Sequence, residues 1–461
     1  MLFNSAQFLF AFLPISYFVF WKLRKRNERY VWLTITGYIF YGSWNYKFCG
    51  LMAFSTLVSF TAGIAMERAK PRWRKLYLVV PVTVDLLLLG FFKYFNFGLQ
   101  ATRGVASWLH WPLHLRTIDI ILPVGISFYT FHTITYIVDS YRGTIKATRN
   151  FFEFACYVCL FPQLVAGPIV RFRQIEADLG NIDHADRLAK RNRGWSFFVI
   201  GMVKKVLIAD TLATAINPAL ADYTHLSTLQ AWLCMLGYTY QIYFDFSGYS
   251  DMAVGLGHLF GLRLPQNFNS PYKANDISDF WRRWHISLST CLRDYLYIPM
   301  GGSRLGTWRT YRNLLTTMLL GGLWHGANWT FVFWGGYHGL LLAFNRSFAD
   351  VWDRMDVRVR RAATFFAVLI GWVFFRANNF SMAATILNRM FTYHPGTVMP
   401  GIFGLLLALA IAAGVAHFAP NTFELQHDWL PVWSAALTLG YALCLIVIVG
   451  GNVSPFLYFQ F

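Results

Sequence analysis

The chain has 461 residues, of which 56% are hydrophobic and 13% charged. Soluble domains hold roughly 45–50% apolar and about 25% charged residues, so this composition excludes a soluble protein and indicates one embedded in a lipid bilayer. Lys and Arg number 40 against 22 acidic residues, a formal net charge of +18, and in a chain with so few charges this excess must lie between apolar stretches.

The N-terminal apolar run, residues 8–21, is followed by a basic cluster at 22–29. A signal peptide places its basic residues before the apolar run, so this segment is interpreted as a first membrane span. Cys156 and Cys159 form a CxxC inside an apolar run, with no second Cys or His pair at metal spacing. They are predicted to be buried thiols, and no metal site is predicted.

Apolar stretches near the roughly 20 residues that a spanning helix needs recur along the chain. They cover 7–21, 30–46, 51–65, 76–97, 118–141, 151–170, 195–220, 231–262, 314–344, 362–375, 401–418 and 432–450. The pattern predicts an all-α polytopic membrane protein with ten to twelve spans. No repeat or Gly/Ser linker divides the chain, so residues 1–461 are interpreted as one membrane domain.

Basic loops predict the orientation, because short cytoplasmic loops carry an excess of Lys and Arg. The segments 22–29, 68–75 and 142–149 are basic and fall in alternate loops, which predicts that the N-terminus lies outside, on the non-cytoplasmic side of the membrane. Alternation then fails, since 171–193 and 263–312 are both basic. Some central segments are therefore expected to enter the bilayer without crossing it.

The segment 276–297, DISDFWRRWHISLSTCLRDYLY, has apolar residues at helical spacing and charged residues between them. It is predicted to be an amphipathic helix at the cytoplasmic interface, with His285 at the edge of its apolar face. A hydrogen-bonded core role is the default for such a histidine. Three arginines flank it, at 282, 283 and 293, and either form the charged interface or attract an anionic ligand.

His325 ends an apolar run and precedes Gly326, and glycines at 321 and 322 permit close backbone approach or a break at membrane depth. An ionisable side chain there is a functional candidate, and histidine suits general-base work near neutral pH. Asn328 would orient the ring if the helix continued. On such a continuous helix, His338 would point away from the face that carries His325. It is expected to pack or to form hydrogen bonds.

The run YFDFSGYSD at 243–251 places Asp245 and Asp251 in an apolar stretch. Buried acids need partners, so they either pair with loop arginines or line a site. The chain has no nucleophile elbow, Walker loop or dinucleotide fingerprint.

Several long motifs resemble one known family. They are LPVGISFYTF (122–131), FPQLVAGPIVRF (161–172), YFDFSGYSDMAVGLG (243–257), the run NFNSPYKANDISDFWRRWHISLSTCLRDYLYIPMGG (267–302) and GGLWHGANWTFVFWGGYHG (321–339). Together they look like the membrane-bound O-acyltransferase (MBOAT) family, in its bacterial branch of alginate O-acetyltransferases and teichoic acid D-alanyl transferases. The alginate type resembles the chain more, also in its ending PFLYFQF.

The resemblance implies helices around a thin central channel, where a cytoplasmic acyl donor meets an acceptor presented from outside. His325, in WHGANW, matches the family's catalytic histidine, and His285 matches its second functional histidine; both fall in the segment 263–345. Asp245, Ser247 and Asp251 match a shared motif, which is interpreted as supporting or structural. The implied activity is acetyl transfer from acetyl-CoA, a substrate and not a bound cofactor, to an exopolysaccharide such as alginate.

In this interpretation His325 is the base, His285 positions the donor or an intermediate, and Arg282, Arg283 and Arg293 attract the donor's phosphates. Tyr458, in an aromatic tail, is either an acyl relay or an interfacial anchor. A periplasmic acetyltransferase or polysaccharide-modifying complex is the expected partner in a bacterial inner membrane. The positive charge of the loops is explained by membrane orientation, so no nucleic acid partner is expected. Cellulose and peptidoglycan stay open as acceptors, and D-alanylation-type transfer stays open as the reaction. A transporter and a non-catalytic scaffold stay open as alternative functions.

Overall fold

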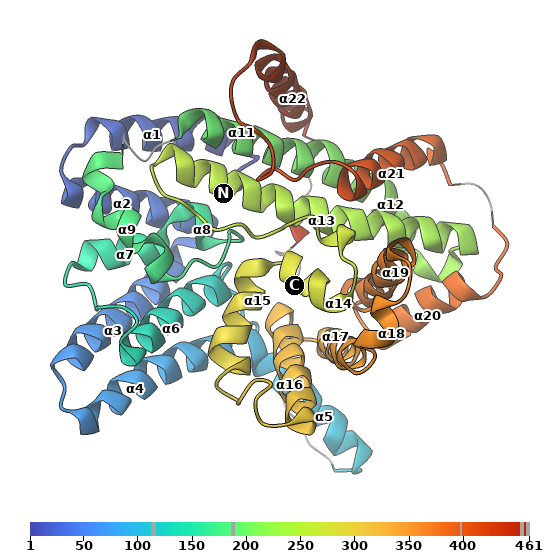
Figure 1. The fold of residues 1–461 in the computed structure, drawn as a ribbon, viewed down its shortest axis with the longest axis horizontal. Coiled ribbons are helices and arrows are strands. Elements are labelled where there is room, and N and C mark those ends of the chain that lie inside the picture. Colours follow the sequence, from blue (N-terminus) through green and yellow to red (C-terminus); the bar gives the residue numbers. More distant parts are fainter. Residues whose placement is uncertain (112–116, 186–189, 397–398, 452–455, 458–461) are drawn as a thin grey trace. The chain divides into compact units, whose positions relative to one another are not determined.

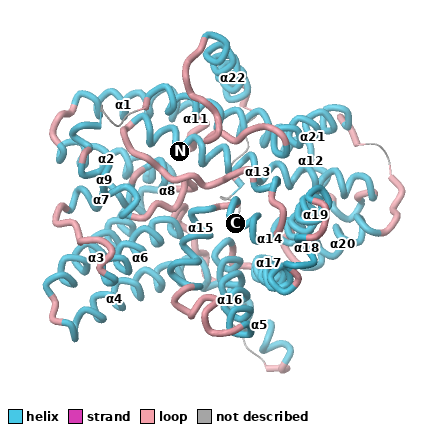
Figure 2. Tube along the Cα trace, viewed as in Figure 1, coloured by secondary structure: helices cyan, strands magenta, loops and turns pink. Residues whose placement is uncertain are grey.

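The computed structural model describes residues 1–111, 117–185, 190–396, 399–451 and 456–457. These residues form helices joined by loops and contain no strand, as Figure 2 shows by its colours. The all-α prediction is therefore confirmed for the part of the chain that is described. The chain divides into two compact units, residues 1–194 with 253–265, and residues 195–252 with 266–461.

The first unit contains most of the blue, cyan and teal helices of Figure 1. They are α1 (Leu13–Lys22), α2 (Arg26–Asn45), α3 (Cys49–Arg68), α4 (Pro71–Leu89), α5 (Phe95–Trp108), α6 (Ile126–Arg142), α7 (Phe151–Cys159), α8 (Phe161–Leu164) and α9 (Phe172–Gly180). Short π or 3-10 turns are η1 (Phe8–Phe12), η2 (Tyr46–Phe48), η3 (Gly90–Tyr94) and η4 (Ile182–His184).

The helices α3, α4 and α6 pack against one another in this unit, and α3 buries the hydroxylated residues Ser55, Thr56 and Ser59. The buried carboxylate of Asp85 on α4 accepts hydrogen bonds from Ser55 of α3 at 2.6 Å and from Thr133 of α6 at 2.7 Å. Buried polar groups need such partners, so this contact fixes the three helices against one another.

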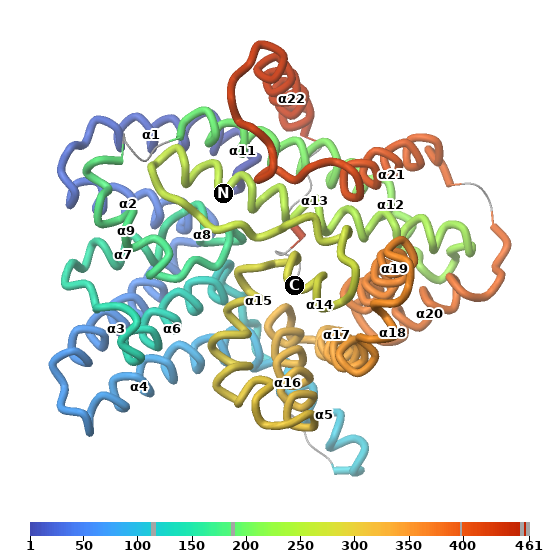
Figure 3. The backbone as a smooth tube through the Cα atoms, in the orientation of Figure 1, coloured from blue at the N-terminus to red at the C-terminus, as the bar shows by residue number. Residues whose placement is uncertain are grey.

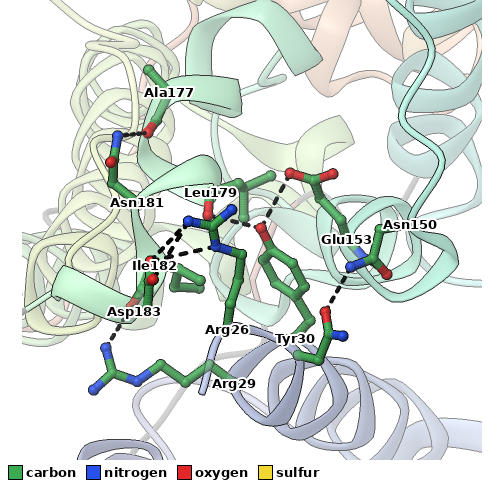
Figure 4. A network of polar contacts seen from close by, with 11 residues as sticks. Arg26, Arg29, Tyr30, Asn150, Glu153, Ala177, Leu179, Asn181, Ile182 and Asp183 are labelled. Atoms are coloured by element: carbon green, nitrogen blue, oxygen red, sulfur yellow. Dashed lines mark hydrogen bonds and ion pairs between the residues drawn. The ribbon is translucent and has the colours of Figure 1, made fainter. Parts of the chain in front are cut away.

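A polar network joins α2 to the segment after α9 (Figure 4). Arg26 contacts Asp183 at 3.2 Å, and Arg29 donates to the carbonyls of Leu23 and Ile182. The network shows that part of the basic cluster predicted from the sequence has structural partners.

The second unit holds the later helices. They are α11 (Arg191–Met202), whose first turn belongs to the first unit, α12 (Asp210–Ala221), α13 (Thr228–Leu259), which continues into the first unit, α14 (Ile277–Arg283), α15 (Ile286–Leu292), α16 (Thr307–His325), α17 (Trp329–Ser347), α18 (Ala349–Asp353), α19 (Val357–Arg376), α20 (Phe380–Phe391), α21 (Ile402–His417) and α22 (Pro431–Val449). Short turns are η5 (Val203–Ala209), η6 (Tyr223–His225), η7 (Pro271–Lys273) and η8 (Arg293–Tyr297).

The predicted apolar stretch 314–344 is a helical hairpin and not one helix. Its two helices, α16 and α17, approach so closely that a Cβ on Gly322 would lie 2.2 Å from the carbonyl oxygen of Phe331. A Cβ on Gly335 would lie 2.2 Å from the carbonyl oxygen of Met318. Only glycine fits such a contact, so these residues set the spacing of the hairpin that carries His325.

Among the described residues, three helical stretches are long and apolar enough to cross a membrane, namely Arg26–Arg68, Pro71–Trp108 and Pro431–Val449. Shorter apolar helices cover Phe8–Lys22 and Ile402–His417. Large apolar side chains on the later helices are exposed, including Phe403 and Val432. Such surfaces suit contact with lipid. The count of ten to twelve spans stays a prediction.

Candidate active site

His285 lies between α14 and α15, and its backbone is left-handed, with φ 43° and ψ 54°. The sequence predicted one continuous helix over 276–297, and this prediction was wrong, because the backbone leaves the helix at Trp284 and His285. Figure 3 shows α14 and α15 as separate coils. A left-handed non-glycine residue costs on the order of 1–3 kcal/mol, and such residues concentrate at functional sites. The break gives His285 a fully buried position.

Asn267 binds both the side chain and the backbone of this turn. Its Oδ1 lies 3.1 Å from Nδ1 of His285 and accepts hydrogen bonds from the N–H of Ser287 at 3.2 Å and its hydroxyl at 2.8 Å. Its carbonyl accepts the N–H of Ile286 at 2.9 Å. The sequence assigned Asn267 no role, although it opens the longest of the matched motifs.

His325 is the last residue of α16 and is 5% exposed. The helix ends there because Gly326 is extended, so the condition for Asn328 to orient the ring is not met. Asn328 instead caps α17, where its Oδ1 accepts the N–H of Thr330 at 3.1 Å and its Nδ2 donates to the carbonyl of Asn378 at 2.7 Å. Asn328 therefore positions the helix that follows His325.

The structure brings the two histidines together, although 40 positions separate them in the sequence. The ring centroids of His285 and His325 lie 6.4 Å apart. Aromatic rings surround His325, with Trp324 at 5.0 Å, Trp334 at 5.1 Å and Phe375 at 5.4 Å. None of these three was singled out from the sequence. These rings make the surroundings of the His325 imidazole largely apolar.

His338 also contacts this aromatic cluster. Its ring lies 4.9 Å from that of Trp334, which itself contacts His325. The helix break explains this proximity, because the two histidines do not share one continuous helix. His338 is fully buried between rings of α14 and α17. This agrees with the packing role predicted for it.

An apolar cavity of about 240 Å³ has His325 in its wall. It lies among α14, α15, η8, α16 and α17 and is lined by Trp281, Leu288, Ser289, Leu292, Arg293, Tyr297, Leu314, Thr317, Met318, Gly321, His325, Trp334 and Leu342. Its wall includes the π-helical turn η8, a feature found frequently at functional sites. His325, a candidate base, and the cationic side chain of Arg293 therefore line the same apolar cavity.

The three arginines do not form one cluster around this cavity. Arg293 lines it, and its side chain is 59% exposed and pairs with Asp294 at 2.7 Å. Arg282 and Arg283 both pair with Asp279, at 3.6 Å and 3.0 Å. Arg283 also donates to the carbonyl of Asn269 at 3.3 Å. Of the three, Arg293 is therefore the one placed to meet a ligand in the cavity.

Asp245 and Asp251 pair with lysines of η5 and not with loop arginines. The Nζ of Lys205 lies 2.5 Å from Asp245 and 2.7 Å from Asp210, while Lys204 lies 2.6 Å from Asp251. Close contact between Gly201 of α11 and Gly248 of α13 allows these pairs, since a Cβ on either would lie within 2.7 Å of the other's carbonyl oxygen. Both acids thus have structural partners, and among the described residues no group of three His, Cys, Asp or Glu is arranged to hold a metal.

Tyr458 lies outside the described residues, but its two preceding neighbours are described. Leu457 donates its N–H to Oδ2 of Asp245 at 3.0 Å, and the ring of Phe456 lies 5.8 Å from that of Phe246. Phe246 in turn contacts the ring of His285 at 4.6 Å. Phe456 and Leu457 are thus buried one aromatic ring away from His285.

Comparison with known proteins identifies the family. A profile of the MBOAT, membrane-bound O-acyltransferase family, matches residues 144–384. The chain is 42% identical to the probable alginate O-acetylase AlgI of Pseudomonas putida, over 100% of both chains. It is 33% identical to the peptidoglycan O-acetyltransferase of Helicobacter pylori, over 100% of this chain and 98% of that protein.

A shorter match, 30% identical, covers 53% of this chain and 63% of the teichoic acid D-alanyltransferase of Bacillus subtilis. The profile covers the segment that holds both histidines and the cavity. Two apolar helical stretches of 43 and 38 residues and the two full-length relatives agree with a chain that passes through the membrane several times. The chain belongs to the membrane-bound O-acyltransferase family and is a multi-pass O-acyltransferase.

Proposed function

We propose that this protein takes an acetyl group from acetyl-CoA on the cytoplasmic side of a bacterial inner membrane and passes it outward for O-acetylation of an exopolysaccharide such as alginate. The observation that carries the proposal is the cavity with His325 in its wall and Arg293 on its lining. The alginate acetylase name of the Pseudomonas putida relative supports the choice of acyl group and polymer.

The cavity suits an activated acyl donor with an anionic end. A thioester carried on a long, mostly uncharged arm gains from the apolar wall, while phosphates at its far end pair with an arginine. Arg293 is the arginine on the lining, and His325 is the titratable side chain that would meet the thioester. Arg282 and Arg283, already paired with Asp279, add positive potential and not direct contacts.

The reaction requires one base. His325 removes the proton from the acceptor hydroxyl, and the oxygen attacks the thioester carbonyl carbon to form a tetrahedral oxyanion. Collapse of this intermediate breaks the carbon–sulfur bond, and the thiolate leaves with the proton that His325 had taken. His285, whose ring is 6.4 Å away, positions the donor or the intermediate. The surrounding aromatic rings exclude water, which would otherwise hydrolyse the thioester.

Tyr458 is proposed as an acyl relay to a periplasmic acetyltransferase or polysaccharide-modifying complex. The burial of Phe456 and Leu457 beside Asp245 and Phe246 supports this proposal, because it holds the end of the described tail near His285. Mass spectrometry of the trapped protein should find acetyl on Tyr458, and full activity of Tyr458→Phe would exclude the relay.

Peptidoglycan is the second candidate acceptor, because the Helicobacter pylori relative that carries that name matches along nearly its whole length. Acetylation of each purified polymer, in membranes that contain the full-length chain and its co-purifying partners, separates the two. D-alanylation has weaker support, since the relative of that name matches only about half of this chain.

Transfer of labelled acetyl from acetyl-CoA by the purified protein tests the enzymatic step itself. We expect transfer by the wild-type chain and none by His325→Ala. A transporter or a scaffold would leave acetyl-CoA intact in both samples. Accessibility labelling of the N-terminus in intact cells tests the periplasmic orientation proposed for it.

A further inference from the structure

The hydrogen bonds around Asn267 fix which ring nitrogen of His285 carries a proton. Oδ1 of Asn267 lies within 3.2 Å of three atoms, namely Nδ1 of His285, Oγ of Ser287 and the backbone nitrogen of Ser287. A backbone N–H can only donate, so the amide atom that faces it must be the oxygen. The amide nitrogen then donates to Ser250 at 3.1 Å.

Because the atom facing His285 is an oxygen, Nδ1 must be the donor in that contact. The neutral imidazole has one N–H, and here it is on Nδ1, so Nε2 keeps its lone pair. Nε2 of neutral His285 therefore accepts a hydrogen bond and cannot donate one to an oxyanion.

We propose that Asn267 is a positioning residue that holds His285 in the Nδ1–H form, so that Nε2 accepts a hydrogen bond from an O–H or N–H group of the substrate. This inference rests on the proposed function, in which His285 positions the donor or an intermediate. The ligand group it predicts is a hydrogen-bond donor, such as the acceptor hydroxyl or an amide N–H of the thioester arm.

The backbone supports the same assignment. The carbonyl of Asn267 accepts the N–H of Ile286, immediately after the left-handed residue His285. Asn267 therefore holds the strained turn through its main chain and the ring through its side chain. A substitution of the side chain keeps the main-chain bond, so the two contributions can be separated by mutation.

The test compares Asn267→Leu with Asn267→Asp in membranes that hold equal amounts of the full-length chain. Leucine has a similar size but accepts no hydrogen bond, and kcat for acetyl transfer should fall by about 10–100-fold, as when a metal-ligating histidine loses its orienting partner. The KM for acetyl-CoA should change little. Aspartate can accept all three donors and receive the Ser250 hydroxyl, so it should recover most of the lost kcat.

Asn269→Leu is the matched control, since Asn269 lies two residues away and its side chain contacts Asn421 and not His285. It should keep the wild-type kcat. Size-exclusion chromatography in detergent verifies folding, and Asn267→Ala replaces the leucine variant if that variant does not fold. Equal loss in the aspartate and leucine variants, or no loss in the leucine variant, would overturn the inference.

His285→Ala distinguishes this inference from the proposed function. If His285→Ala is inactive while Asn267→Leu keeps its kcat, only the positioning role of Asn267 is wrong. If His285→Ala keeps its kcat, the role of His285 in the proposed function is wrong, and the inference about Asn267 fails with it.

Discussion

Two regions use polar side chains in opposite ways, namely the network around Arg26 and Arg29 in the first unit and the histidine pair in the second. In the network, each labelled polar group meets a partner of matching chemistry (Figure 4). Tyr30, for example, donates to the carbonyl of Leu179 at 2.8 Å and lies 3.2 Å from Glu153. This network links the start of α2 to α7 and to the segment after α9.

Around the histidines, Asn267 contacts Nδ1 of His285, and the rings of Phe246 and Trp324 also lie beside His285. The backbone of His285 is strained, and an apolar cavity borders His325. Matched local pairing, as in the network, marks a structural role. A buried titratable ring in the wall of an apolar cavity marks a candidate binding site.

The largest expected effect comes from removing the ring of His325. His325→Ala should lower kcat by at least about 100-fold, the lower end of what a positioned base contributes. The variant should still fold in detergent, because the ring borders an existing cavity. A large loss of thermal stability would instead place His325 with the structural residues of the network.

Filling the cavity should weaken donor binding. Leu342→Trp places a large ring in the cavity lining and should raise the KM for acetyl-CoA by about tenfold, which corresponds to about 1.4 kcal/mol. Leu340→Trp is the matched control, because Leu340 is on the same helix but 62% exposed. Equal KM values in the two variants would show that the donor does not occupy this cavity.

Removing Arg29 should affect stability and not catalysis. Arg29→Met leaves the buried carbonyl of Ile182 without this donor, which costs about 1–3 kcal/mol of unfolding free energy. The kcat of the folded fraction should be unchanged. Arg24→Met, at an exposed position of the same basic cluster, serves as the control in thermal melting. A selective loss of kcat in Arg29→Met would contradict the purely structural role assigned to Arg29.

The smallest effect is expected at the exposed ion pair of the network. Arg26→Ala should cost no more than about 1 kcal/mol, because the pair with Asp183 is solvated and its side chains are 48% and 28% exposed. Raising the salt concentration should reduce even this difference. A double-mutant cycle with Asp183→Asn measures the coupling, and a value well above that limit would contradict the solvated-pair interpretation.

The helical class and the apolar segments could be predicted from the sequence, because they depend on composition and on local runs of residues. The stretch at 195–220 corresponds to the continuous helical segment α11–η5–α12, and the stretch at 401–418 corresponds to α21. His325 could be proposed as a candidate from its place at the end of an apolar run and from the WHGANW motif. Breaks were harder to predict, since helical spacing over 276–297 continues through Trp284 and His285 although the backbone does not.

The sequence by itself determined that the chain is an all-α membrane protein with two candidate histidines, since hydropathy and motifs are properties of neighbouring residues. Only the tertiary structure decided that Asn267 holds His285, that Lys204 and Lys205 pair with Asp251 and Asp245, and that Arg293 shares a cavity with His325. These contacts join residues 18 to 47 positions apart. The helix break at His285 and the close approach of Gly201 and Gly248 accompany two of them. Helical periodicity carries no information about contacts of that kind.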